Sequence, residues 1–353
     1  MAMSLAQIGL LCALWSIGGG MGWGKMLLLV ACMCGFFVYT LYKNQESMLY
    51  QPKVMAQFIT PSQNPPTYRD PAEHSMLYEN VYFTTSDGVK LHAWFIHQPE
   101  PQCHPTIVFF HANAGNMGFR LANLKQLYES LHVNILITSY RGYGESEGSP
   151  SEDGLILDAQ AAWQYISLRA DVNQDAIVCF GRSLGGAVTI ALAAEHTDKM
   201  RGVVLENTFT SISDLVDTLF PLLRVFKHQI LRLRWESIKR IPKVSVPILF
   251  ISGGMDEVVP KVHMQNLHAA AAAVGAESKK WFFCPEGMHN DTWQKAGPAY
   301  TDAIRDFLAE VVPGYPSKAL AAVERQKQKT TQPQSEATGT ACSPSSPSAE
   351  SVD

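Results

Sequence analysis

Residues 176–186 read A-I-V-C-F-G-R-S-L-G-G, and this stretch decides how the rest of the chain folds. Its first five residues form an apolar run typical of a buried strand, and an alanine-rich helical segment follows Gly186. Ser183 lies between them in a Gly-x-Ser-x-Gly pattern, where small residues let strand and helix approach around a strained turn. Such a pattern also occurs by chance, with the serine only capping a helix. The strand before it and the helix after it favour a nucleophile.

Segments of alternating type extend in both directions from this stretch. Short apolar runs of the kind buried on both faces alternate with segments whose apolar spacing is helical. This alternation predicts βαβ units and a mostly parallel sheet, with the first two strands joined as an antiparallel pair. The expected strands are 81–85, 91–97, 106–111, 134–140, 176–181, 202–206, 247–252 and 280–284, and the expected helices are 117–131, 152–170, 185–197, 261–275 and 296–311. The prediction is therefore an α/β-hydrolase fold with an eight-stranded sheet and flanking helices.

A serine hydroxyl in this turn needs a base, and a carboxylate must orient that base. In this fold the carboxylate follows a later strand and the histidine comes last. Asp256 follows the apolar run 247–252, and His289 follows the run 280–284. Because Ser183, Asp256 and His289 occur in the required order, we expect them to form a catalytic triad.

Other side chains compete for these roles. Glu206 ends the expected strand 202–206, where some proteins of this fold place the acid, so it could replace or support Asp256. His263 and His268 lie within an expected helix, where a packed or solvated histidine is the commoner outcome. Two further neighbours are interpreted as exposed loop charges, namely Glu257 and Asp291.

The oxyanion of an acyl-transfer intermediate requires two N–H donors, one after the nucleophile and one from the loop after the third strand. The backbone of Leu184 is the first expected donor. The loop H-A-N-A-G-N at 111–116 supplies the second, with the backbone of Asn113 as first choice and that of Ala112 as the alternative. Asn113 could also simply form a turn.

Charge and composition exclude several classes of function. The chain of 353 residues holds 28 Lys and Arg against 32 Asp and Glu, so its net charge of -4 provides no field that would attract nucleic acid. Residues 19–25 have the spacing of a phosphate loop, but Met26 follows where Ser or Thr must bind magnesium. We expect no nucleic-acid partner, no cofactor and no metal.

The amino terminus is apolar: residues 5–42 contain a single charged side chain, Lys25. The run 26–42 predicts one membrane-spanning signal-anchor at the short end of the usual length. The weaker run 5–17 forms either a separate half-hairpin or an extension of the span. A cleaved signal peptide is the competing interpretation, but no basic region precedes the run and no clear cleavage site follows it. Since Lys25 and Lys43 flank the span symmetrically, charge does not fix its orientation.

Seven cysteines lack the paired spacing of a disulfide framework. Cys179 and Cys284 lie in expected strands, where cysteine behaves as a small buried apolar residue. Cys32 and Cys34 could accept palmitate near the membrane, although cysteine is also tolerated in apolar spans.

These features divide the chain into an anchor (1–43), a proline-bearing extended connector (44–78), a hydrolase domain (79–312) and a disordered tail (313–353). Within the domain, residues 207–246 leave the sheet for longer than a crossover helix needs, which predicts a small cap beside the site. The cap is either core with a solvated helix face or an amphipathic surface on anionic lipid. Its apolar residues are Leu215, Leu219, Phe220, Leu222, Leu223, Val225, Phe226, Ile230, Leu231 and Trp235, and its basic residues are Arg224, Lys227, Arg232, Arg234, Lys239, Arg240 and Lys243.

Several motifs together resemble the abhydrolase-domain-containing protein 13 type of membrane-anchored serine hydrolase, which includes fungal bud-emergence relatives. They are L-Y-Q-P at 49–52, H-A-N-A-G-N at 111–116, S-Y-R-G-Y-G-E-S-E-G at 139–148, G-R-S-L-G-G at 181–186, E-N-T-F-T-S at 206–211 and G-M-H-N at 287–290. The resemblance covers residues 49–312 and implies a single-pass type II membrane protein with the triad at Ser183, Asp256 and His289. Ala112 departs from the family pattern, which has glycine there, and adds a methyl group where the backbone and the acyl group crowd.

The leading hypothesis is hydrolysis of an acyl ester or thioester, with a lipid or an acylated protein as the substrate. The fold also serves peptide-bond cleavage, so a membrane-bound serine peptidase is the alternative. A binding protein that retains the triad as a relic is the third.

Overall fold

The computed structural model describes residues 23–53, 57–196, 200–221, 224–225, 227–272 and 278–331. Within these residues one eight-stranded sheet has the order β1-β2-β4-β3-β5-β6-β7-β8. β2 pairs antiparallel with β1 and β4, and the other neighbouring pairs are parallel. The predicted strands and the mostly parallel sheet are confirmed. The strands are β1 (Tyr78–Thr84), β2 (Lys90–Ile96), β3 (Thr106–Phe110), β4 (Asn134–Thr138), β5 (Ile177–Arg182), β6 (Met200–Glu206), β7 (Ile248–Gly253) and β8 (Lys279–Cys284).

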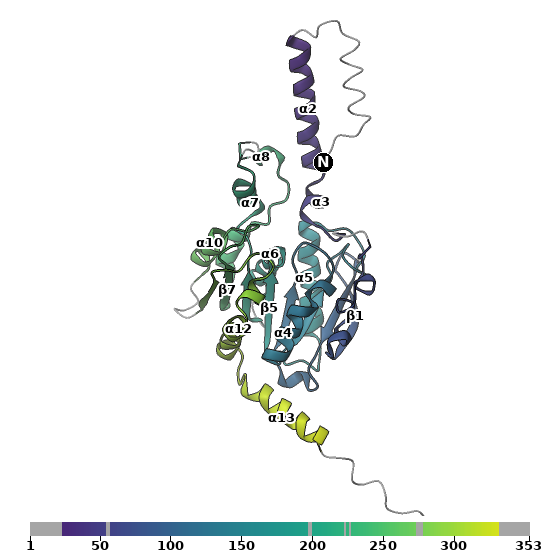
Figure 1. The fold of residues 1–353 in the computed structure, drawn as a ribbon, viewed down its shortest axis with the longest axis vertical. Helices are drawn as coiled ribbons and strands as arrows, with labels where there is room; N and C mark the ends of the chain where they lie inside the picture. Colours follow the sequence, from purple (N-terminus) through teal and green to yellow (C-terminus); the bar gives the residue numbers. More distant parts are fainter. Residues whose placement is uncertain are drawn as a thin grey trace, which may run out of the picture.

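Helices cover both faces of the sheet, as Figure 1 shows. In β3, Val108 and Phe110 pack in one core and Ile107 and Phe109 in the other. Because both faces are covered, the inner strands β3, β4, β5 and β7 are buried along their whole length and are largely apolar. The edge strand β8 is partly exposed, so the expectation that its run 280–284 is buried on both faces is wrong. One core includes α5 (Glu152–Ser167), α6 (Leu184–Ala193) and α10 (Val262–Ala270), and the other includes α4 (Leu121–Leu131) and α12 (Pro298–Val311). Two short helices lie beside the sheet, η4 (Met117–Arg120) and α11 (Thr292–Lys295).

Helix α2 (Trp23–Lys43) extends from the domain along the long axis of the molecule (Figure 1). Its 21 residues give a length of about 30 Å, which matches the hydrocarbon thickness of a bilayer. Its apolar side chains, including Leu27, Leu28 and Phe36, are exposed. In the described part of the chain it is the one helix long and apolar enough to cross a membrane. The predicted span 26–42 lies inside it, whereas the run 5–17 lies outside the described residues.

The prediction of an extended connector over residues 44–78 is wrong for much of this segment. It forms the short helices α3 (Gln45–Leu49), η1 (Pro61–Gln63) and η2 (Pro71–His74), and residues 54–56 lie outside the described residues. Tyr50 is only 2% exposed and packs in the core. Prolines predicted a spacer, but burial of this aromatic side chain, worth about 2–3 kcal/mol, holds the segment on the domain.

Residues 207–246 leave the sheet between β6 and β7, as predicted for the cap. They form α7 (Ile212–Leu219), α8 (Lys227–Ile230), α9 (Ser237–Arg240) and η6 (Ile241–Lys243), while residues 222, 223 and 226 lie outside the described residues. Trp235 and Ile241 are fully buried, so the second half of the segment belongs to the core. Leu219, Phe220 and Val225, in the middle of the segment, are exposed. Figure 1 shows α7 and α8 beside the end of α2 that joins the domain.

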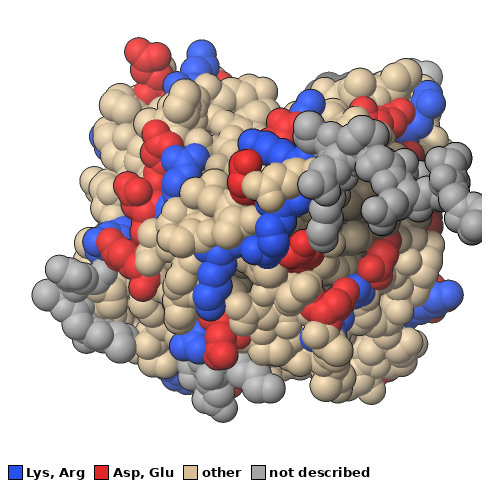
Figure 2. All heavy atoms as spheres, turned by 90° about the horizontal axis from the view of Figure 1, so that it is seen from below, with Lys and Arg blue, Asp and Glu red and all other residues tan. Residues whose placement is uncertain are grey.

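The prediction of a disordered tail over residues 313–353 is wrong for its first part. Helix α13 (Ser317–Thr331) follows α12, and residues 332–353 lie outside the described residues. Its alanines at 319 and 322 are buried against the core, and Arg325 pairs with Glu100 at 2.8 Å. Strong helix formers and a few small buried residues suffice for this helix, although its composition is polar. Figure 2 shows the molecule from this end, where acidic and basic side chains are interspersed.

Candidate active site

The turn after β5 has the strained geometry expected of a nucleophile. Ser183 has φ 54° and ψ -120°, a conformation that L-residues rarely adopt. A Cβ on Gly181 would lie 2.2 Å from the carbonyl oxygen of Gly185. A Cβ on Gly185 would lie 2.0 Å from the carbonyl oxygen of Phe110 at the end of β3. Glycine at both positions therefore lets β5, α6 and β3 meet around the serine.

Three side chains form one hydrogen-bonded chain in this turn. His289 Nε2 lies 2.9 Å from Ser183 Oγ, and His289 Nδ1 lies 2.8 Å from Asp256 Oδ2. Since an ionised carboxylate only accepts, Nδ1 donates to Asp256, and Nε2 of the neutral ring accepts from the serine. The second oxygen of Asp256 accepts the backbone N–H groups of Val258 and Val259, at 2.9 and 2.7 Å. The structure thus brings together the three residues that the sequence predicts.

Glu206, the alternative acid, lies in a different network. Its Oε2 accepts from Arg182 Nη2 and from the hydroxyl of Tyr300, both at 2.8 Å. Arg182 also donates to Asn123 of α4. Burial, and then the Glu206 carboxylate, raises the pKa of Tyr300 well above its ordinary value, so its hydroxyl stays a donor. Arg182 of β5 and Tyr300 of α12 thereby engage Glu206. Among the described residues, its carboxylate makes no hydrogen bond to His289.

The other rivals also have structural partners. His263 Nδ1 lies 2.8 Å from Thr210 Oγ1, and burial lowers the pKa of this histidine. Asp291 accepts the backbone N–H of Met288 at 2.7 Å and so shapes the loop before His289. His268 packs against Trp281 at the edge of the sheet.

The loop after β3 lies next to the serine turn, because Gly185 contacts the carbonyl oxygens of Phe110 and His111. Among the described residues, the backbone N–H groups of Ala112 and Asn113 have no hydrogen-bond acceptor. Burial, followed by the charge of Arg120, lowers the pKa of His111 to about 3. Its neutral ring donates through Nδ1 to the carbonyl oxygen of Ala112 at 2.7 Å. The loop is thus fixed while two N–H groups stay available.

Sequence reasoning missed the role of Asn207, the residue directly after β6. Its left-handed backbone (φ 48°) places the side chain between the loops that carry Asp256 and His289. Oδ1 accepts from Gly253 N at 2.8 Å, and Nδ2 lies 3.2 Å from the carbonyl oxygen of His289 and 3.0 Å from Thr292 Oγ1. Its place in the E-N-T-F-T-S motif, at the carboxyl end of a strand, is the signal that could have indicated this role.

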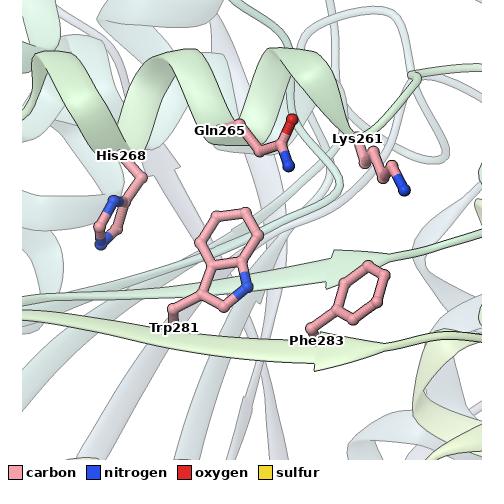
Figure 3. Close-up of a pocket in the computed structure, with 5 residues that line it drawn as sticks. All are labelled: Lys261, Gln265, His268, Trp281 and Phe283. Carbon is pink, nitrogen blue, oxygen red and sulfur yellow. The ribbon is translucent and has the colours of Figure 1, made fainter.

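A surface hollow of about 440 Å³ lies between α10 and edge strand β8, away from Ser183, His289 and Asp256. Figure 3 shows Lys261, Gln265 and His268 on one face of the helix above Trp281 and Phe283 of the strand. Its lining includes no member of the serine, histidine and aspartate chain. In the described part of the molecule, no group of His, Cys, Asp or Glu side chains could hold a metal ion.

Fold and site together define an α/β hydrolase. The alpha/beta hydrolase fold family matches residues 105–230. Among solved structures, the Pyrococcus furiosus esterase Pf2001 is similar with a TM-score of 0.57 and 19% identity, over 69% of this chain and 94% of that chain. At this identity the likeness shows the fold alone.

Curated relatives are much closer in sequence. The alpha/beta hydrolase domain-containing protein WAV2 of Arabidopsis thaliana is 41% identical, over 76% of this chain and 89% of the relative. Protein bem46 of Schizosaccharomyces pombe is 42% identical, over 76% and 87%. The uncharacterized membrane protein YNL320W of Saccharomyces cerevisiae is 39% identical, over 68% and 82%. The chain therefore belongs to the family of α/β-hydrolase domain proteins that includes WAV2 and bem46, and the predicted resemblance is confirmed.

Proposed function

We propose that the protein is a serine hydrolase that cleaves acyl esters or thioesters, with Ser183 as the nucleophile. The observation that carries this proposal is the hydrogen-bonded chain from Ser183 through His289 to Asp256. Each of the three residues is at most 8% exposed, so their charges and hydrogen bonds act with little competition from water.

The chemistry proceeds in two halves. His289 Nε2 takes the hydroxyl proton as Ser183 Oγ bonds to the acyl carbon, and the carbonyl oxygen becomes an oxyanion. Collapse of this intermediate breaks the ester or thioester bond, and His289 gives the proton to the departing alcohol or thiol. Water then attacks the acyl-enzyme while His289 accepts its proton. As the bond between the acyl carbon and Ser183 Oγ breaks, His289 returns that proton to Oγ and the carboxylic acid leaves. Asp256 holds the ring in the required tautomer.

Two backbone N–H groups stabilise the oxyanion in this proposal. Leu184 supplies one at the start of α6, and Asn113 supplies the other, with Ala112 as the alternative. The close contact between Gly185 and the β3 loop supports this assignment, because it brings the two donor segments together. Loss of one such donor lowers kcat by about 10²–10³-fold in hydrolases.

A membrane-derived acyl substrate is favoured by the surroundings of the site. We assign α2 as a single membrane span, on its length and exposed apolar surface. The type II orientation is taken from the family resemblance alone. Leu219, Phe220 and Val225 of the cap are exposed, at the end of α7 and in the segment between α7 and α8. Figure 1 shows α7 and α8 at the same end of the molecule as α2. An apolar surface beside a membrane span suits contact with lipid or with an acyl chain attached to a membrane protein.

The basic side chains of the cap contribute less to this contact than their number suggests. Four of them pair with carboxylates within the protein, namely Lys227 with Asp217, Arg232 with Glu46, Lys239 with Glu236 and Arg240 with Glu152. Arg224 is exposed. We therefore propose that the cap meets the membrane mainly through its apolar end.

Labelling by a fluorophosphonate tests the proposal on the full-length protein in detergent. We expect labelling of wild type and of Ser86→Ala, a control at an exposed turn serine, and none of Ser183→Ala. Equal labelling of Ser183→Ala, or no labelling of wild type, would contradict the enzyme assignment and favour a binding protein. Panels of acyl esters, acyl thioesters and peptides then separate the proposed activity from that of a peptidase.

A further inference from the structure

The segment that joins the membrane helix to the domain is bonded directly to the oxyanion loop. Gln51 donates its N–H to the carbonyl oxygen of Asn113 at 3.0 Å, and its own carbonyl oxygen accepts from Gly115 N at 2.9 Å. These two bonds form an isolated parallel bridge between Gln51 and Ala114. The side chain of Asn113 adds a third bond, from Nδ2 to the carbonyl oxygen of Leu49 at 2.8 Å. Three hydrogen bonds thus join residues 49–51 to the loop.

Only a few residues separate this contact from the membrane helix in the sequence. α2 ends at Lys43, and only Asn44 and the five residues of α3 separate it from Tyr50. Tyr50 is fixed in the core, where its hydroxyl accepts from Trp235 Nε1 at 3.0 Å. The segment therefore has a fixed position on the domain side as well.

The same segment is bonded to the cap. The buried side chain of Gln45 donates to the carbonyl oxygen of Ile230 at 2.7 Å and accepts from Arg232 N at 2.7 Å. Arg232 also reaches Glu46 at 2.6 Å and donates to the carbonyl oxygen of Tyr42 at 3.0 Å. Residues 45–51 therefore bind the end of the membrane helix, the cap and the oxyanion loop to one another.

We propose that residues 49–51, with Gln51 at their centre, position the oxyanion loop of the hydrolase and hold the Asn113 N–H where the oxyanion forms. The proposal rests on the proposed function. The carbonyl oxygen of Asn113 accepts from Gln51 N and from Tyr143 Oη, which fixes the peptide plane that follows Asn113. The plane that carries the Asn113 N–H is fixed next to it, because His111 Nδ1 donates to the carbonyl oxygen of Ala112. Oxyanion donors act only when they are held at hydrogen-bond distance before the reaction. The membrane anchor is thereby connected to catalysis through the polypeptide backbone.

Gln51→Pro tests this role, because it removes the N–H that donates to Asn113 and leaves the triad untouched. Tyr50 already has the extended backbone (φ -91°, ψ 117°) that a residue before proline requires. Gln51→Ala keeps the N–H and should restore the activity that proline removes. The substrate is a p-nitrophenyl acyl ester, and phenylboronic acid, which forms a tetrahedral adduct on the serine, reports the oxyanion site.

We expect Gln51→Pro to lower kcat by about 10- to 100-fold, somewhat less than complete loss of an oxyanion donor. KM should stay within about threefold, and the affinity for phenylboronic acid should fall in parallel with kcat. A Gln51→Pro enzyme with wild-type kcat, or with a kcat loss explained by its labelled fraction, would overturn the positioning role.

Asn113→Ala provides a second test if the proline variant does not fold. It removes the bond to Leu49 and keeps the backbone donor, so the same pattern should follow; unchanged boronate affinity and kcat would overturn the proposal. A wild-type protein that neither hydrolyses the ester nor reacts with fluorophosphonate refutes the proposed function. Activity that survives in both variants refutes only the positioning role.

Discussion

A methyl group at Gly185 should separate the nucleophile turn from the oxyanion loop. The added Cβ of Gly185→Ala would lie 2.0 Å from the carbonyl oxygen of Phe110 and 2.8 Å from that of His111. Both obstacles are backbone atoms, so no side-chain rotation relieves the overlap. Ordinary contact begins at 3.4 Å, and the two segments must therefore move apart by about 1.4 Å. A displacement of this size between reacting groups lowers rates by about 10²-fold.

The variant should also lose about 1–3 kcal/mol of unfolding free energy, as overpacked cores do. The assay is kcat for acyl-ester hydrolysis together with urea unfolding of the same preparation. Gly202→Ala is the matched control, since its Cβ would lie 2.7 Å from the ring of Phe307, far along β6 from the site. It should lose stability and keep kcat. A folded Gly185→Ala enzyme with the wild-type kcat would refute the idea that this approach fixes the oxyanion site.

Two further predictions separate chemistry from stability. Asp256→Asn should lower kcat by about 10⁴-fold with little change in unfolding free energy, because the histidine loses the tautomer that catalysis needs. Glu206→Gln should instead lower the unfolding free energy by about 3–5 kcal/mol, because it leaves Arg182 unpaired. Kinetics and unfolding are measured on both variants, and the reverse result would make Glu206 the acid. The pKa of His111 in the folded protein, about 3, lies below its ordinary value of 6.5, so folding favours the neutral ring. The contribution of His111 to the unfolding free energy is therefore complete above pH 6.5 and is lost as the pH falls. Between pH 6.5 and 5 this loss approaches about 2 kcal/mol, and urea unfolding of His111→Asn should show a correspondingly weaker pH dependence; identical slopes would contradict the assignment.

The sheet and the contact among Ser183, His289 and Asp256 could be predicted because they depend on local signals. Strands such as β3 and β5 are buried on both faces, so each is a continuous apolar run bounded by loops. Asp256 follows β7, which is such a run, and His289 follows the apolar residues of the edge strand β8. Parallel strands bring their carboxyl ends to one edge of the sheet. The order of these residues in the chain and their positions after strands were therefore enough to predict most of the candidate site.

Alternation within a strand could have resolved the choice of acid. In β6, Val204 packs with the α4 and α12 core, while Val203 and Leu205 pack with the other. Because side chains alternate between faces, Glu206 shares the face of Val204. The register that pairs Arg182 with Glu206 across β5 and β6 places both charges there. The sequence contained this information, but only once the strand register was known.

Contacts between remote segments could not be predicted. Gln45 reaches Ile230, 185 residues away, through hydrogen bonds that leave no periodic pattern in the sequence. Likewise, the bonds of Gln51 to the oxyanion loop involve its backbone, which is the same for every residue except proline. The L-Y-Q-P motif marked the segment, but its chemistry became visible only with its partners in place.

Helices α2 and α13 lie at opposite ends of the molecule (Figure 1). With α2 in a bilayer, α13 lies at the far end of the domain, beyond the sheet. A protein that bound α13 would be held a full domain away from the lipid surface and would not compete with it for space. The distance between the two helices therefore keeps α13 away from any reaction that the proposed hydrolase carries out at the membrane.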